Sequence, residues 1–276
     1  MIYIIFIIII YIMLLFYTFC VDIRRWNQLE LKKALKMLVN SIHKNIKTYK
    51  IICYTNFKID DMQEYNIEFR KYYDNMVHKL YNDRWLNLSF NKINIYKDLY
   101  DEFKKDFIWI DLDTIICYDI SYINKLSNVF IINDGNCAVP KVLFSNNNKI
   151  KVAQNKYIQG NFWKLNIDLY NNLMETLKKI LSKGLCLRYD LQDLFNYYFH
   201  IENKDINILD ESMNGLAVWS SKGNTHATLD GLNKLYIDDG ILKSKYYPNK
   251  EIHILSFTFM TLRKLWYTNN YKKLFD

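Results

Sequence analysis

The chain has 276 residues, half of them hydrophobic and 24% charged, so it can bury a sizeable core and is unlike a disordered sequence. The net charge of +8 and the pI near 9.0 suit an anionic partner, or else a lysine-rich solvated surface. The lysines are dispersed and no nucleic-acid motif is present, so we expect no nucleic-acid partner. The five cysteines form no C-x-x-C pair, which indicates neither a disulfide framework nor a zinc site.

An apolar stretch opens the chain, and MIYIIFIIIIYIMLLFYTFCV has no charged side chain before Asp22. Its length matches the roughly 20 apolar residues that span a bilayer, and the arginines behind it would keep the protein body on the cytoplasmic side. In the competing interpretation, residues 14–22 form the first strand of the domain. We therefore predict an apolar segment over 1–13, a candidate membrane anchor that extends to residue 21 in the first interpretation, and one domain over 14–276. The protein is expected to be either membrane-associated through a single N-terminal anchor or cytoplasmic.

The rest of the chain shows alternating helical and strand patterns without an internal repeat or linker, which predicts a single α/β domain. Helical spacing of apolar residues predicts helices over 28–46, 66–82, 89–105, 169–181 and 190–199. Short apolar runs predict strands over 50–55, 107–116, 128–132, 139–144, 157–163, 215–219 and 251–256, with a hairpin turn at 146–148.

Two aspartates follow an apolar run in the stretch FIWIDLDTII. On a continuous strand, Asp111 and Asp113 point to the same side because side chains alternate between faces. Two such charges repel each other unless a cation neutralises them, and carboxylate oxygens are the ligands that Mg²⁺ and Mn²⁺ prefer. The alternative is a strand end with two solvated aspartates in a turn.

Further candidate residues lie in three later motifs. In YDLQDLFNYYF, Asp190 and Asp193 share the polar side of a helix, as candidate catalytic carboxylates or as a solvated face. In YIQGNFW, Gly160 allows a ligand or a second backbone to approach, and Asn161 offers a donor and an acceptor; a bulge with a surface asparagine is the alternative. In EIHILSF, His253 is either a core histidine or a third ligand beside the aspartates.

The order of these parts resembles a GT-A nucleotide-sugar glycosyltransferase. The likeness rests on an early strand ending near Tyr54-Thr55, a helix leading into FIWIDLDTII, then IQGNFW, LQDLFN and a late histidine, over residues 14–266. It implies a Rossmann-like GT-A domain with a mixed central sheet flanked by helices. It also implies transfer of a hexose from a nucleotide-diphosphate sugar, preferably a UDP-sugar, to a glycan, protein or lipid acceptor.

The same resemblance implies roles for individual residues. Asp111 and Asp113 would bind Mn²⁺, or Mg²⁺ in its place, with His253 as a late ligand. The metal would bridge the donor pyrophosphate and stabilise the leaving diphosphate. Asp111 would therefore also count as a donor-binding residue, because the metal that it holds binds the donor.

Donor and sugar contacts are implied for four other positions. Lys92 resembles the basic position on the helix before the metal strand, and Gly160 and Asn161 match the sugar-contacting strand. Gln192 and Asp193 match the "QD" motif, in which the acid orients the sugar or acts in catalysis.

Two other function classes are open on the sequence. A haloacid dehalogenase-like phosphatase would use Asp111 as nucleophile and Asp113 as general acid. However, Ile115 stands where that pattern has Thr or Val, and more than a hundred residues precede the motif. A non-enzymatic, membrane-tethered binding module would tolerate Asp111→Asn and Asp113→Asn.

Overall fold

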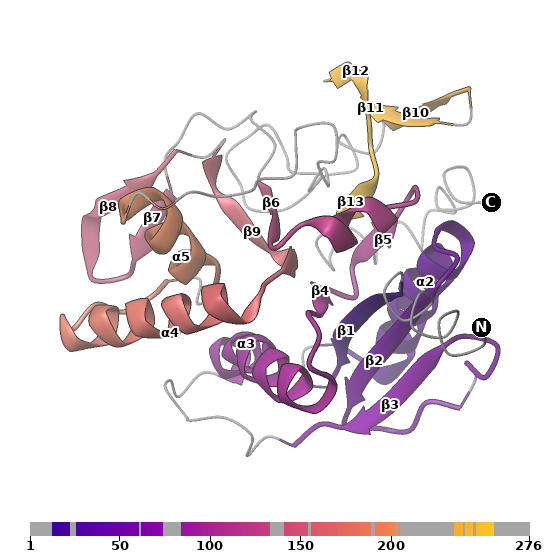
Figure 1. Ribbon diagram of the computed structural model, residues 1–276, viewed down its shortest axis with the longest axis horizontal. Coiled ribbons are helices and arrows are strands. Elements are labelled where there is room, and N and C mark those ends of the chain that lie inside the picture. The colour runs from indigo at the N-terminus through magenta and orange to yellow at the C-terminus, as the bar shows by residue number, and fades with distance from the viewer. Residues whose placement is uncertain are drawn as a thin grey trace, which may run out of the picture.

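The computed structural model in Figure 1 describes residues 13–22, 26–60, 62–73, 84–132, 141–153, 156–188, 191–202, 204, 235–239, 241–244 and 247–256. The fold is α/β, as predicted: a six-stranded mixed sheet with helices against it. The strand order is β3-β2-β1-β4-β9-β6. The strands are β1 (Leu14–Cys20), β2 (Tyr49–Thr55), β3 (Ile67–Lys71), β4 (Ile108–Ile110), β9 (Ile158–Lys164) and β6 (Val129–Ile132).

The path of the chain creates a switch point in this sheet. Strand β1 is parallel to both of its neighbours, β2 and β4, and β2 is parallel to β3. From β1 the chain moves outward through β2 to β3, then returns to form β4 on the other side of β1. Strand β9 is antiparallel to β4 and to β6. The carboxyl ends of β1 and β4 therefore border the crevice where open α/β sheets bind their ligands.

Helices cover both faces of the sheet (Figure 1). Helix α2 (Gln28–Asn45) packs on the face to which Leu14 and Phe16 of β1 point. It begins at a capping box, in which the Asn27 side chain accepts from the Glu30 amide at 2.8 Å and Glu30 reaches back to the Asn27 amide. Helices α3 (Arg84–Phe103), α4 (Ile167–Ser182) and α5 (Leu191–Asn196) pack on the opposite face with Tyr17. A turn of π-helix at Tyr197–Ile201 continues α5.

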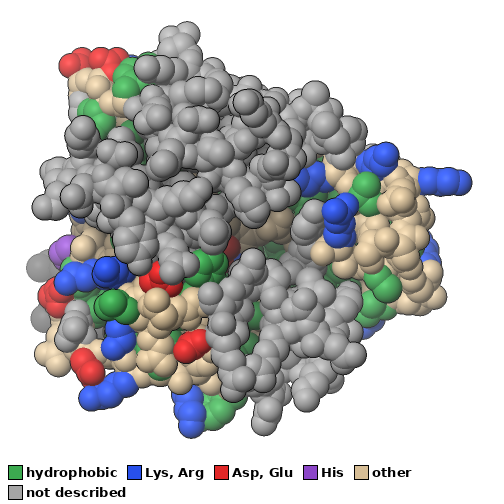
Figure 2. All heavy atoms as spheres, turned by 180° about the vertical axis from the view of Figure 1, so that it is seen from behind, with side chains coloured by type: hydrophobic (Ala, Val, Ile, Leu, Met, Phe, Trp, Pro, Cys, Tyr) green, Lys and Arg blue, Asp and Glu red, His purple; other side chains and the backbone are tan. Residues whose placement is uncertain are grey.

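Smaller elements surround the main sheet. Strand β5 (Thr114–Ile116) pairs antiparallel with β13 (Ile254–Ser256), and a five-residue 3₁₀ helix (Ser121–Lys125) follows β5. Strands β7 (Lys141–Phe144) and β8 (Asn147–Val152) form a hairpin, whose turn at 145–146 begins one residue before the turn predicted at 146–148. Lys and Arg side chains gather at the end of the molecule that carries this hairpin (Figure 2), where Lys149 and Lys151 of β8 are exposed. Strands β10 (Leu235–Asp238), β11 (Ile241–Ser244) and β12 (Tyr247–Glu251) form a separate antiparallel sheet.

The apolar N-terminal stretch contributes a central strand. Residues Leu14–Cys20 are buried at every position and pair with β2 over their whole length. This is the second of the two interpretations of the segment, because a strand in the middle of a sheet cannot also cross a bilayer. Residues 1–12 lie outside the described part of the chain. No helix of the described part is long and apolar enough to cross a membrane.

Most predicted elements are present, and three differ. The strand predicted over 251–256 is interrupted at residues 252–253, so that only Ile254–Ser256 forms β13. Where a helix was predicted over 66–82, Ile67–Lys71 forms edge strand β3, since its backbone pairs with β2; residues 74–83 lie outside the described ranges. The strand predicted over 107–116 is split into β4 and β5 by a turn. The strand predicted over 215–219 also lies outside the described residues, and the β10–β12 sheet was not predicted.

Candidate functional site

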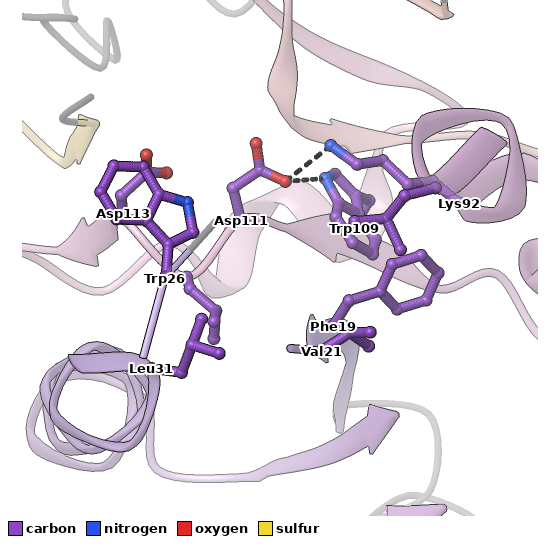
Figure 3. Close-up of a pocket in the computed structure, with 10 residues that line it drawn as sticks. Phe19, Val21, Trp26, Leu31, Lys92, Trp109, Asp111 and Asp113 are labelled. Carbon is purple, nitrogen blue, oxygen red and sulfur yellow. Dashed lines mark hydrogen bonds and ion pairs between the residues drawn. The ribbon is translucent and has the colours of Figure 1, made fainter. Parts of the chain in front are cut away.

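The two aspartates of FIWIDLDTII lie on a tight turn at the carboxyl end of β4. Strand β4 ends at Ile110, and the Thr114 amide donates to the Asp111 carbonyl at 3.1 Å, which closes a four-residue turn. The prediction of a continuous strand was therefore wrong in its geometry. The turn still brings both carboxylates to one place, and they point the same way in Figure 3. That place is the switch point beside β1.

The carboxylate of Asp111 is held by two donors on the same oxygen (Figure 3). Lys92 Nζ, from α3, and Trp109 Nε1, from β4, each lie 2.8 Å from Asp111 Oδ1. The Lys92 ammonium also lies 4.5 Å from the centre of the Trp109 ring, a cation–π distance. The Tyr17 hydroxyl donates to the Lys92 carbonyl at 2.8 Å, which ties this turn of α3 to β1. Lys92, expected to contact the donor, therefore lies beside the candidate metal-binding aspartates.

The carboxyl group of Asp113 sits in an unfavourable electrostatic environment. Burial and the nearby charge of Asp111 raise the pKa of Asp113 well above its usual value, and Lys92 opposes the rise only in part. No side chain of the described residues is hydrogen-bonded to this carboxylate. A second negative charge beside Asp111 therefore costs free energy unless a cation joins the pair.

A small pocket of about 100 Å³ opens between the turn and the ends of β1 and α2. One end is charged, and the rest is apolar or aromatic. The lining residues are Phe19, Val21, Trp26, Leu31, Leu88, Lys92, Trp109, Asp111, Leu112 and Asp113. At about 30 Å³ per water molecule, this volume holds about three waters, which is room for a phosphate-sized group or for a cation with part of its water shell.

The aspartate turn is tied to β9 and β13. The Asp111 amide donates to the Asn161 carbonyl at 2.8 Å, so Asn161 lies next to the turn. The Asn161 side-chain amide donates to Ser256 Oγ, and Ser256 Oγ lies 3.3 Å from Thr114 Oγ1. Asn161 Oδ1 is buried and has no hydrogen-bond partner in the described part of the chain. These contacts fix the turn from two sides.

The glycine of YIQGNFW makes room for a side chain of the protein. A Cβ at Gly160 would lie 2.7 Å from Gln192 Cγ of α5, closer than any normal contact. The group that approaches Gly160 is therefore the Gln192 side chain, whereas a ligand or a second backbone was expected. Asn196, one turn later on α5, holds the same strand: it bonds the Ile158 amide at 2.9 Å and the Ile158 carbonyl at 3.0 Å. Gln192 and Asn196 therefore dock α5 on β9.

The position of Asp193 argues against the catalytic role predicted for it. It is 0% exposed, it accepts a hydrogen bond from the Tyr157 hydroxyl at 2.8 Å, and it does not line the pocket. A residue that touches substrate must be reachable, whereas Asp193 anchors α5 from within the core. Asp190 lies outside the described residues.

His253 is not brought to the aspartates. Ser256 pairs with Thr114 at the turn, whereas the His253 carbonyl accepts from the Cys117 amide at 2.7 Å, three residues further along the ribbon. The ring contacts Tyr118, and its Nε2 lies 3.2 Å from a Glu251 carboxylate oxygen. In the described ranges, no group of three His, Cys, Asp or Glu side chains could hold a metal ion.

The donor set that remains suits a hard divalent cation shared with a substrate. Asp111 Oδ2 and the Asp113 carboxylate are the available oxygens, because Asp111 Oδ1 is already bonded twice. Mg²⁺ and Mn²⁺ commonly take one or two carboxylates and complete their octahedron with water and phosphate oxygens. The residues therefore fit such an ion without His253.

Sequence reasoning missed the tryptophans of this site. Trp109 lies two residues before Asp111, and that spacing on a strand could have indicated a shared side. Trp26 lies far away in the sequence and carries no local signal. Comparison with known proteins adds no assignment: no protein-family model matches the chain, and no curated protein matches it.

Proposed function

We propose that the chain is a metal-dependent glycosyltransferase of the GT-A type. It would move a hexose from a nucleotide-diphosphate sugar, with UDP-sugars as first candidates, to a glycan, protein or lipid acceptor. The observation that carries the proposal is the position of the turn with Asp111 and Asp113, at the carboxyl end of β4 and beside β1. This is the switch point of the sheet, where a diphosphate ligand is expected.

The charges around the turn suit a pyrophosphate held through a cation. Asp111 and Asp113 would hold Mn²⁺ or Mg²⁺ through carboxylate oxygens. Lys92, 2.8 Å from Asp111, is placed to turn its ammonium toward a phosphate oxygen. When bound, the ion neutralises charge that develops on the leaving diphosphate.

The apolar wall of the pocket supports the same chemistry. Phe19 and Val21 from the end of β1, with Trp26 before α2, exclude water from one side of the charged centre. Electrostatic attraction between carboxylates, cation and phosphate is stronger where water is excluded. The site thus combines carboxylate oxygens that suit a hard cation with an apolar wall that keeps water away from one side.

Attachment to a membrane surface through the apolar residues 1–13 is part of this proposal. Flotation of the full-length protein with phospholipid vesicles tests it. Protein that floats with the vesicles supports attachment, and protein that stays at the bottom of the gradient contradicts it.

Release of nucleoside diphosphate tests the reaction class. The full-length protein is incubated with UDP-, GDP-, CDP- and ADP-linked hexoses, with and without Mn²⁺, and the products are separated by chromatography. We expect metal-dependent release of one nucleoside diphosphate, lost in Asp111→Asn and Asp113→Asn. Asp119→Asn is the matched control, because Asp119 is exposed and, within the described part of the chain, its side chain is hydrogen-bonded only to the nearby Ser121.

The same samples separate the other two function classes. Hydrolysis of p-nitrophenyl phosphate that depends on Asp111, without release of nucleoside diphosphate, would indicate that the protein is a phosphatase and not a glycosyltransferase. Absence of both reactions, with nucleotide binding unaffected by either substitution, would indicate a binding module.

A further inference from the structure

Trp109 presents a rigid hydrogen-bond donor to the candidate metal-binding turn. Its side chain is 1% exposed, and its Nε1 lies 2.8 Å from Asp111 Oδ1. Edge contacts with Tyr17 and Phe19, at 5.1 and 4.8 Å between ring centres, hold the indole on one side. Trp163 stacks beside it with 25° between the ring planes. The indole therefore cannot turn away without disturbing the core.

The two hydrogen-bond donors on Asp111 make its two carboxylate oxygens different from each other. A carboxylate oxygen has about two lone-pair sites, so Lys92 and Trp109 together fill Oδ1. Oδ2 is then the oxygen left to bind a cation. We infer that Trp109 is a positioning residue that orients Asp111 so that it binds a cation through Oδ2 alone. This inference rests on the proposed function.

The two donors differ in what they can do when a ligand arrives. Lys92 has a flexible side chain and can move to a phosphate oxygen, whereas the packed indole of Trp109 stays in place and keeps Oδ1 hydrogen-bonded. Asp111 would thus keep its orientation through the reaction, held by a neutral donor that does not repel the metal. Partners of this kind typically alter metal affinity by about 10- to 100-fold when removed.

A carboxylate limited to one oxygen also influences which ion binds. Mg²⁺ and Mn²⁺ take six ligands in an octahedron and accept single carboxylate oxygens. Ca²⁺ takes six to eight oxygens and often uses both oxygens of a carboxylate. Freeing Asp111 Oδ1 should therefore weaken Mn²⁺ more than Ca²⁺.

The chain offers a matched control for a tryptophan substitution. Trp163 faces Trp109 across the β4–β9 pair, is equally buried, and its indole N–H has no hydrogen-bond partner in the described part of the chain. Trp109→Phe and Trp163→Phe remove the same volume from the same stack. Only the first removes a hydrogen bond to Asp111.

Mn²⁺ titration followed by electron paramagnetic resonance of the free ion tests the inference without any turnover. The full-length wild type, Trp109→Phe, Trp163→Phe and Asp113→Asn are titrated with Mn²⁺ alone and then with Ca²⁺ as competitor. We expect Trp109→Phe to bind Mn²⁺ about tenfold more weakly. We also expect its preference for Mn²⁺ over Ca²⁺ to fall, and Trp163→Phe to match the wild type.

Each outcome separates this inference from the proposed function. If Asp113→Asn removes Mn²⁺ binding and the two tryptophan variants behave alike, the positioning role is wrong and the metal site stands. If the wild type shows no Mn²⁺ binding that Asp113→Asn removes, both fail. If Trp109→Phe does not fold, replacing Trp109 with benzothienylalanine, whose ring has sulfur in place of N–H, gives the same comparison.

Discussion

Replacing Lys92 with methionine should destabilise the protein in a way that Mn²⁺ reverses. Lys92 and Asp111 are only 14% and 28% exposed, so their contact is shielded from water. A hydrogen bond to a charged group contributes about 1.5–3 kcal/mol, and partial exposure places this one near 2 kcal/mol. For a chain of this size, that corresponds to a fall in Tm of about 5 °C.

Differential scanning fluorimetry with and without Mn²⁺ measures this effect. Without metal, Lys92→Met leaves Asp111 and Asp113 uncompensated, so Tm falls; with Mn²⁺, the added cation should restore most of the loss. Lys178→Met is the matched control, because Lys178 and Glu175 form an exposed ion pair whose removal should leave Tm unchanged. Equal effects of the two substitutions, or a loss in Lys92→Met that Mn²⁺ does not reverse, would refute the reasoning.

Three further predictions concern the surroundings of the site. Asn196→Ala should lower the free energy of unfolding in urea by about 3 kcal/mol, because the buried Ile158 amide and carbonyl lose their partner; a loss below about 1 kcal/mol contradicts this. Burial lowers the pKa of His200, so the unfolded chain takes up its proton first and stability should fall as the pH drops below about 6.5. In His200→Gln, the change in Tm between pH 7 and 5 should be smaller, and an unchanged slope argues against this origin. Asp193→Asn should lower Tm and keep Mn²⁺ binding, because Asp193 lies in the core beside Tyr157; loss of Mn²⁺ binding at full stability would restore a role in the site.

The fold was largely predictable where apolar residues repeat regularly. The helix at Gln28–Asn45 has both the spacing and the capping box, so its start and its buried face follow from the sequence. Strand β3 was mistaken for a helix, because IEFRK has no strong alternation of its own and becomes a strand by pairing with β2. Pairing between distant segments has no local signal. The β10–β12 sheet is a different case, because its strands follow one another along the chain and Asp239-Gly240 is a local hairpin signal that was overlooked.

The two aspartates of the site were predictable from the sequence, whereas the backbone conformation that presents them was not. Asp111 and Asp113 were expected together because of their spacing at one strand end, and Lys92 was expected near the donor because of the resemblance alone. The turn that separates β4 from β5 was not expected, since the apolar residues on both sides of the aspartates read as one strand. The burial of Asp193 depends on how α5 docks on β9, which only the tertiary structure defines.

The most direct test of the account is the thermal shift of the full-length protein with UDP, GDP, CDP and ADP, each with and without Mn²⁺. The account predicts a stabilisation that requires both one diphosphonucleotide and the metal, and that disappears in Asp113→Asn. Stabilisation by a nucleotide without any need for the metal or for Asp113, or no stabilisation of the folded protein by any of the four, would contradict it.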